Sequence, residues 1–181
     1  FLDKECMLIN SSAQTKNAVI EEIASIAVQN DNLTHFTTED IYNALKTREA
    51  LSSTGIENGV ALPHCQMDML DDLVLGILTT KEGIPYDSID NSPARLFFFI
   101  IGPTEKRHLH VHLLSSLSRI VMKEETRNAL ISAKKKDQII KILQNAGKID
   151  GDYTKEEKKC LFTVYVQNQD YIDTILSVFS N

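Results

Sequence analysis

A chain of 181 residues in which 43% of the side chains are hydrophobic can bury the core of one ordinary domain without disulfides or a structural metal. Its formal net charge is −6, and no basic face is evident in the order of residues. This balance argues against nucleic acid and anionic membrane surfaces as partners, and it says nothing sharper about a protein partner.

The cysteines and the short apolar runs favour a reducing, cytoplasmic compartment. Cys6, Cys65 and Cys160 are odd in number and widely spaced, so they build neither a disulfide framework nor a C-x-x-C zinc pattern. The longest apolar run, residues 96–101, has the length of a strand and is far shorter than a bilayer requires. We therefore expect a cytoplasmic protein with no stable membrane insertion.

Two helices are predicted at the start of the chain. Residues 11–30 place apolar side chains at helical spacing, and Ser11 or Ser12 could cap this helix. Residues 37–51 repeat the pattern, with Thr37 or Thr38 before an acidic first turn. A helix that ends near Leu51 delivers Arg48 and Glu49 in its last turn.

Short strands are predicted next, because glycine and proline interrupt residues 52–102. Residues 74–79 (VLGILT) and 94–101 (ARLFFFII) are typical of strands, the second apolar enough to be central, with a loop over residues 82–93 between them. From His108 the period is helical again, and residues 124–133 and 136–146 predict two more helices. The apolar face of the first of these three helices would carry Leu109, Leu113, Leu117, Ile120 and Val121.

A strand and a helix are predicted beyond Gly147 and Gly151, over residues 160–166 and 169–179. One strand and one helix cannot bury themselves. This extension, residues 149–181, would dock on the main body, pair with a second chain in a homodimer, or begin a truncated second domain.

The stretch GVALPHC (residues 59–65) contains the strongest candidate for chemistry. Pro63 fixes its own backbone φ and pushes Leu62 into an extended conformation, so the imidazole of His64 emerges in a restricted direction. A neutral imidazole is a competent nucleophile that can carry a phosphoryl group, given an arginine to bind the dianion and a second donor. The simpler interpretation is a histidine at a strand end that pairs with a local carbonyl. Cys65 projects to the opposite side and is expected to be a small apolar filler.

Three further histidines suggest an alternative. His108, His110 and His112 could ligate zinc if they lay on a strand, as in a metal-dependent hydrolase. On a helix, His108 and His112 lie close together, while His110 points away from them by about 160–200°. The helical period that follows favours the second arrangement.

Several motifs together resemble one family. The stretches at residues 48–64 (REALSSTGIENGVALPH), 83–103 (GIPYDSIDNSPARLFFFIIGP) and 110–120 (HVHLLSSLSRI) resemble the IIA domains of the phosphoenolpyruvate-dependent sugar phosphotransferase system, fructose/mannitol type. This type includes the nitrogen-regulatory IIA proteins. The resemblance covers residues 10–146, with the motifs in the family's order. We therefore expect a IIA-type domain over residues 1–148.

The resemblance implies a fold and a site. The fold would be an α/β protein, a three-layer α/β/α sandwich around a small mixed sheet, followed by the C-terminal strand-helix extension. His64 would be the phosphorylated histidine, Arg48 the phosphate-site arginine and His110 the second histidine, which orients the phosphoryl group. His108 and His112 would then be surface residues.

The resemblance also implies partners. Phosphate would come from the HPr-like phosphocarrier protein and pass to a cysteine of a IIB component in trans, with no metal and no cofactor. The alternative is a nitrogen-branch regulatory protein, in which the phosphorylation state of His64 controls binding to other proteins. The motif GIPYDSIDN favours the fructose and nitrogen branches over mannitol.

Overall fold

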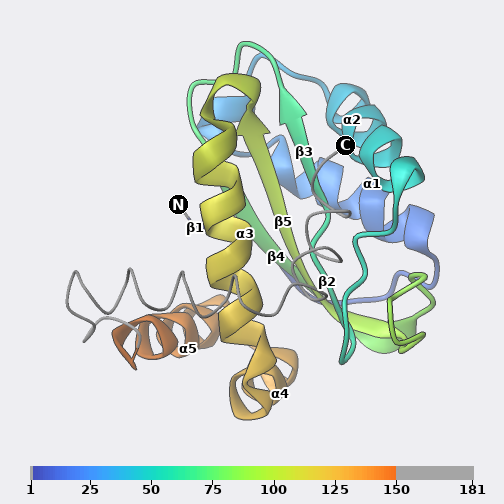
Figure 1. Cartoon of the computed structure of the whole chain (residues 1–181), viewed down its shortest axis with the longest axis vertical. Helices are drawn as coiled ribbons and strands as arrows, with labels where there is room; N and C mark the ends of the chain where they lie inside the picture. The colour runs from blue at the N-terminus through green and yellow to red at the C-terminus, as the bar shows by residue number, and fades with distance from the viewer. Residues whose placement is uncertain (1, 150–181) are drawn as a thin grey trace, which may run out of the picture.

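The computed structural model describes residues 2–149 as a mixed sheet between two layers of helices (Figure 1). The three-layer α/β/α sandwich predicted from the sequence is confirmed. The sheet has five strands: β1 (Leu2–Ser11), β2 (Val60–Ala61), β3 (His64–Met67), β4 (Val74–Ile84) and β5 (Ala94–Pro103). The strand-helix extension predicted for residues 149–181, and the homodimer it would form, lie outside the described residues apart from residue 149.

The sheet is built around an antiparallel pair, β4 and β5. β1 lies parallel to β4 on one side, while β2 and β3 both lie parallel to β5 on the other. The apolar sequence of β5 fits its central place, because both of its faces are buried. In this register His64 lies beside Ile100 of the central strand.

The strand β1 was not predicted. Its sequence, LDKECMLINS, has three charged residues directly after Leu2 and lacks the alternation of polar and apolar side chains that identifies a strand. It lies at the edge of the sheet, and its register against β4 shifts twice. An edge strand with irregular pairing leaves little periodic signal in the sequence.

One face of the sheet is covered by α1 (Lys16–Ala27) and α2 (Thr38–Leu51), joined through a short 3-10 helix at Asp31–Leu33. The prediction that Ser11 or Ser12 caps α1 is wrong, because β1 extends through Ser11 and the side chain of Thr15 accepts a hydrogen bond from the amide of Ala18. The α2 prediction is confirmed, with Thr37 as the N-cap of a capping box. Its end at Leu51 is also where the sequence predicts it.

The other face is covered by α3 (Arg107–Met122), α4 (Glu124–Ser132) and α5 (Lys136–Ile149). A 3-10 helix, Thr104–Lys106, leads from β5 directly into α3. The buried face of α3 differs from the one predicted, because it carries His110, Leu114, Leu117 and Val121. Leu109 is exposed instead. The buried face of α3 is therefore shifted at its start by one residue from the predicted apolar face, and it includes His110. No helix among residues 2–149 is long and apolar enough to cross a membrane.

The predicted loop at residues 82–93 is shorter in the structure, because β4 continues to Ile84. The protein has one hydrophobic core on each face of the sheet, and successive side chains of β5 point alternately into the two cores. Phe97 and Phe99 pack with α1 and α2, whereas Phe98 and Ile100 pack with α3 and its neighbours. The central strand therefore joins the two helical layers to the edge that carries His64.

A glycine in β4 makes room for this core. Gly76 lies opposite Phe99, and a Cβ atom at Gly76 would lie 2.0 Å from the ring of Phe99 and 2.5 Å from the carbonyl oxygen of Cys6. We expect Gly76→Ala to lower the free energy of unfolding by at least ~1–3 kcal/mol, the typical cost of overpacking a core. Urea denaturation measures this change. Lys81→Ala, at an exposed position of the same strand, should change the stability by less than about 0.5 kcal/mol. Equal effects of the two substitutions would contradict the packing described here.

Candidate functional site

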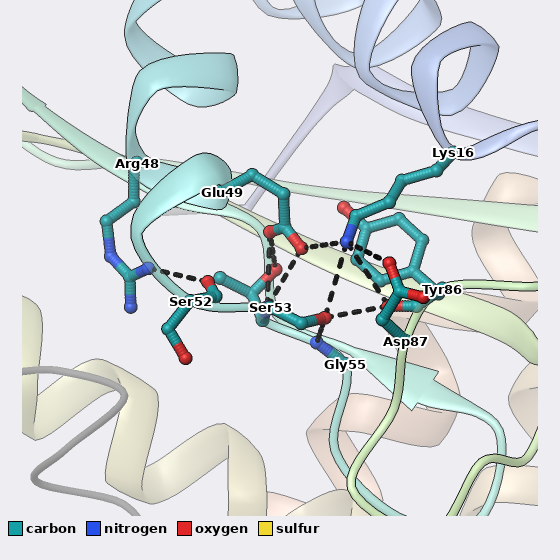
Figure 2. A network of polar contacts seen from close by, with 9 residues as sticks. Lys16, Arg48, Glu49, Ser52, Ser53, Gly55, Tyr86 and Asp87 are labelled. Atoms are coloured by element: carbon teal, nitrogen blue, oxygen red, sulfur yellow. Dashed lines mark hydrogen bonds and ion pairs between the residues drawn. The ribbon is translucent and has the colours of Figure 1, made fainter.

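The structure brings Arg48 and His64 into direct contact. Arg48 lies in the last turn of α2, where only 9% of the residue is exposed. Its Nε donates a hydrogen bond to Nε2 of His64 at 3.1 Å, and its Nη1 donates to the carbonyl oxygen of Ser52 at 3.0 Å. Figure 2 shows the guanidinium directed away from Glu49, the next residue of the helix. The two residues therefore serve different sides of α2.

A backbone carbonyl fixes the tautomer of His64. The residue is the first of β3 and is 6% exposed, and its Nδ1 lies 2.7 Å from the carbonyl oxygen of Leu62. A carbonyl oxygen only accepts hydrogen bonds, so Nδ1 carries the proton in the neutral ring. The lone pair is then on Nε2, the nitrogen that faces Arg48. Pro63 separates β2 from β3, and its carbonyl accepts from the amide of Ile100, which anchors this corner to β5.

His110 lies beside His64 from the opposite helical layer. Its ring centroid is 5.4 Å from that of His64, with the two planes at 68°. The residue is 2% exposed, and neither ring nitrogen has a hydrogen-bond partner among the described residues. Gly102 allows this approach, because a Cβ at Gly102 would lie 2.7 Å from Nδ1 of His110.

Burial keeps both histidines neutral at pH 7. Removal from water lowers the pKa of His64 to about 3, and the positive charge of Arg48 and the nearby His110 add to this effect against the opposing hydrogen bond to Leu62. Burial, followed by the charges of Arg48 and Arg107, lowers the pKa of His110 to about 4. In a neutral His64, Nε2 carries no proton, so the lone pair that accepts from Arg48 can act as the nucleophile once that hydrogen bond is exchanged.

The three side chains border a cavity of about 490 Å³ that opens between α2, β3 and the start of α3. Arg107, the first residue of α3, also lines it and was not predicted from the sequence. Arg107 precedes His110 by three residues, and residues three apart lie on the same face of a helix. This spacing could have indicated that Arg107 lies near the site.

The cavity contains buried hydrogen-bond donors that have no partner within the described part of the chain. Nη2 of Arg48 and the ring of His110 form no hydrogen bond among residues 2–149. Buried polar groups without a partner are uncommon and call for an explanation such as a ligand. Two such groups beside a neutral imidazole suit a small anion bound next to Nε2 of His64.

The other candidates from the sequence do not join the three residues of the site. Cys65 borders the same cavity but is buried in the core on the side of α1 and α2, in agreement with its expected role as an apolar filler, and burial raises the pKa of its thiol to about 12. His108 and His112 are exposed on α3, whereas His110 is buried. The three imidazoles therefore do not converge, and residues 2–149 contain no group of three or more side chains placed to hold a metal ion. The hydrolase alternative receives no support from this geometry.

Comparison with known proteins matches residues 1–146 to the family model described as "Phosphoenolpyruvate-dependent sugar phosphotransferase system, EIIA 2". The fructose-specific EIIABC component of Bacillus subtilis is 32% identical over 148 residues, which are 81% of this chain but 23% of that protein. The nitrogen regulatory protein of Klebsiella oxytoca is 29% identical over 147 residues, which are 81% of this chain and 89% of that protein.

A solved structure shares the fold. The complex of enzyme IIAMtl with phosphorylated enzyme IIBMtl from Escherichia coli contains a chain that superimposes with a TM-score of 0.67 at 18% identity, covering 80% of this chain and 99% of that one. The family model spans both helical layers, the whole sheet and all three residues of the site. The chain therefore belongs to the EIIA 2 family of the phosphoenolpyruvate-dependent sugar phosphotransferase system.

Proposed function

We propose that the protein is a histidine phosphocarrier of sugar uptake. Nε2 of His64 accepts a phosphoryl group from the phosphohistidine of an HPr-like carrier and passes it to a cysteine of a IIB component in trans. The main support is the orientation of the His64 ring. The unprotonated Nε2 lies 3.1 Å from Nε of Arg48, while Nδ1 is bonded to the carbonyl oxygen of Leu62.

The transfer exchanges one nitrogen–phosphorus bond for another. The Nε2 lone pair forms the new bond to phosphorus as the bond to the donor imidazole breaks, and the donor nitrogen keeps that electron pair. The proton on Nδ1 stays in its hydrogen bond to the carbonyl of Leu62, which stabilises the positive charge that develops on the ring. In the second transfer, a cysteine thiolate attacks phosphorus and the electron pair returns to Nε2.

Arg48 and His110 stabilise the transferred group. The guanidinium occupies the direction from which phosphorus approaches, so Nε of Arg48 exchanges its bond to Nε2 for one to a phosphoryl oxygen. Nη2 of Arg48 and a ring N–H of His110 supply two more donors, both unpaired among the described residues. Arginine suits this task because its planar fork matches the phosphoryl oxygens.

The surroundings of the cavity suit a docked protein. Leu51 of α2 is 58% exposed and Val111 of α3 is 42% exposed, and both border the cavity. Apolar side chains around a buried polar centre are typical of a protein interface. The HPr-like donor and the IIB acceptor would use this surface in turn, because both must reach the same nitrogen.

The cytoplasm is the compartment we propose. Cys6 and Cys65 are both free thiols buried in the core, which is consistent with a reducing environment. A relay that starts from phosphoenolpyruvate would draw its phosphate there.

A regulatory role is the second candidate. The similarity to the nitrogen regulatory protein of Klebsiella oxytoca extends over 89% of that protein, so the domain matches a regulator over most of its length. A regulator would use the same His64 chemistry and would bind other proteins according to its phosphorylation state. Onward transfer to a IIB cysteine separates the two roles, because only the transport role requires it.

The first prediction for the site concerns the phosphoryl acceptor. After incubation with phosphoenolpyruvate, enzyme I and HPr, the wild-type chain should carry about one acid-labile, base-stable phosphate, as phosphohistidine on nitrogen does. His64→Ala should carry none, and His112→Ala, at an exposed position of α3, should match the wild type. Full labelling of His64→Ala would disprove the assignment.

The second prediction concerns Arg48. Arg48→Lys keeps the charge but removes the planar fork, so phosphorylation should slow by roughly 100-fold, as for the loss of one oriented donor in other enzymes. Rapid-quench measurement of the phosphorylation rate tests this expectation. Arg95→Lys, at an exposed position of β5, is the control and should retain the wild-type rate. A rate within twofold of the wild type for Arg48→Lys would rule out a specific role for the guanidinium.

A further inference from the structure

Glu49 follows Arg48 in α2 but takes no part in the cavity. Its side chain is 7% exposed and its carboxylate accepts from the backbone N–H of Thr54 at 3.0 Å, from the hydroxyl of the same Thr54, and from Nζ of Lys16 at 2.7 Å. Figure 2 shows these contacts on the side of α2 that faces Lys16, away from the Arg48 guanidinium. A buried carboxylate with this many partners holds those partners in place, because the loss of any one contact leaves a buried negative charge less well compensated.

Thr54 connects this carboxylate to Arg48. The chain leaves α2 at Ser52 in an extended conformation, and the segment from Glu49 to Thr54 closes a short loop through the Glu49 side chain. The carbonyl oxygen of Ser52, inside this loop, accepts the hydrogen bond from Nη1 of Arg48. Fixing Thr54 therefore fixes the acceptor that orients the guanidinium.

Thr54 also connects the carboxylate to His64. The carbonyl oxygen of Thr54 accepts from the amide of Leu62 at 2.9 Å, and the carbonyl oxygen of Leu62 lies 2.7 Å from Nδ1 of His64. The same segment pairs once more through the bridge between Gly55 and Ala61. Displacement of Thr54 would therefore move the carbonyl that sets the tautomer of His64.

Lys16 balances the buried charge and anchors the network to the rest of the fold. Its ammonium group, at the start of α1, also contacts Asp87 at 3.1 Å and lies 4.7 Å from the ring centroid of Tyr86. Asp87 is largely exposed, so its pair with Lys16 is weak, and Glu49 is the principal partner of the lysine. Burial lowers the pKa of Arg48, and the negative charge of the neighbouring Glu49 opposes this effect.

We propose that Glu49 is a positioning residue: paired with Lys16, it fixes Thr54, and through Thr54 it sets both the Ser52 carbonyl that holds Arg48 and the Leu62 carbonyl that holds His64. The consequence for phosphoryl transfer rests on the proposed function of His64. The geometric part of the proposal does not depend on it.

The test uses a double variant that avoids leaving a buried lysine unpaired. Lys16→Met with Glu49→Leu replaces the ion pair by apolar side chains of similar volume, which commonly preserves stability. It removes every contact from the carboxylate to Thr54. Glu49→Gln is the conservative variant, because its amide oxygen still accepts from the backbone of Thr54. Glu57→Gln, at an exposed position in the following loop, removes one negative charge and serves as the control.

Two measurements are made on each variant, at a temperature well below its unfolding midpoint. The first is the rate of phosphorylation by phosphoramidate, a small donor that needs no protein partner. The second is the nitrogen NMR spectrum of the His64 ring, which reports its tautomer. The double variant should be phosphorylated roughly 10- to 100-fold more slowly, as expected for misplaced reacting groups, and should show a mixture of His64 tautomers. Glu49→Gln should recover most of the rate, and Glu57→Gln should match the wild type.

The outcomes separate the two proposals. A double variant with the wild-type rate and a single wild-type tautomer, even with a lower unfolding midpoint, would overturn the positioning role and leave the phosphocarrier function intact. A wild-type protein that phosphoramidate does not label would count against the phosphocarrier function. In that case the tautomer measurement would still decide whether Glu49 positions His64.

Discussion

The hydrogen bond between Nδ1 of His64 and the carbonyl of Leu62 determines which nitrogen of the imidazole is available for chemistry. Because the carbonyl can only accept, the proton stays on Nδ1 and the lone pair of Nε2 faces the cavity. Pro63 sets the chain direction between these two residues, and β5 holds the corner in place through Ile100. Each further feature of the site, from the approach of Arg48 to the neighbouring His110, depends on this orientation of the ring.

Burial gives this arrangement its chemical character. A site that is withdrawn from water holds both histidines neutral, and it strengthens the field of the Arg48 guanidinium beside them. The donors of Arg48 and His110 that lack partners among the described residues are therefore poised for an anion, and they need little rearrangement when it arrives. The network of Glu49 and Lys16 lies behind this site and carries no donor into it.

The family resemblance pointed to Arg48, His64 and His110, and the structure places these three residues side by side. Parts of the fold that depend on periodicity alone were predicted less completely. The strand β1 and the true buried face of α3 escaped prediction, since an irregular edge strand and a helix that buries a histidine both depart from simple apolar periodicity. The roles of Leu62, Thr54 and Gly102 could not have been predicted either, because they depend on backbone atoms and close approach.

Nitrogen NMR of the His64 ring shows whether Nε2 is the atom that accepts the phosphoryl group. In the free protein at pH 7 we expect one neutral tautomer with its proton on Nδ1, and after phosphorylation we expect the nitrogen–phosphorus coupling on Nε2. A phosphoryl group on Nδ1, or a free protein with its proton on Nε2, would contradict the account.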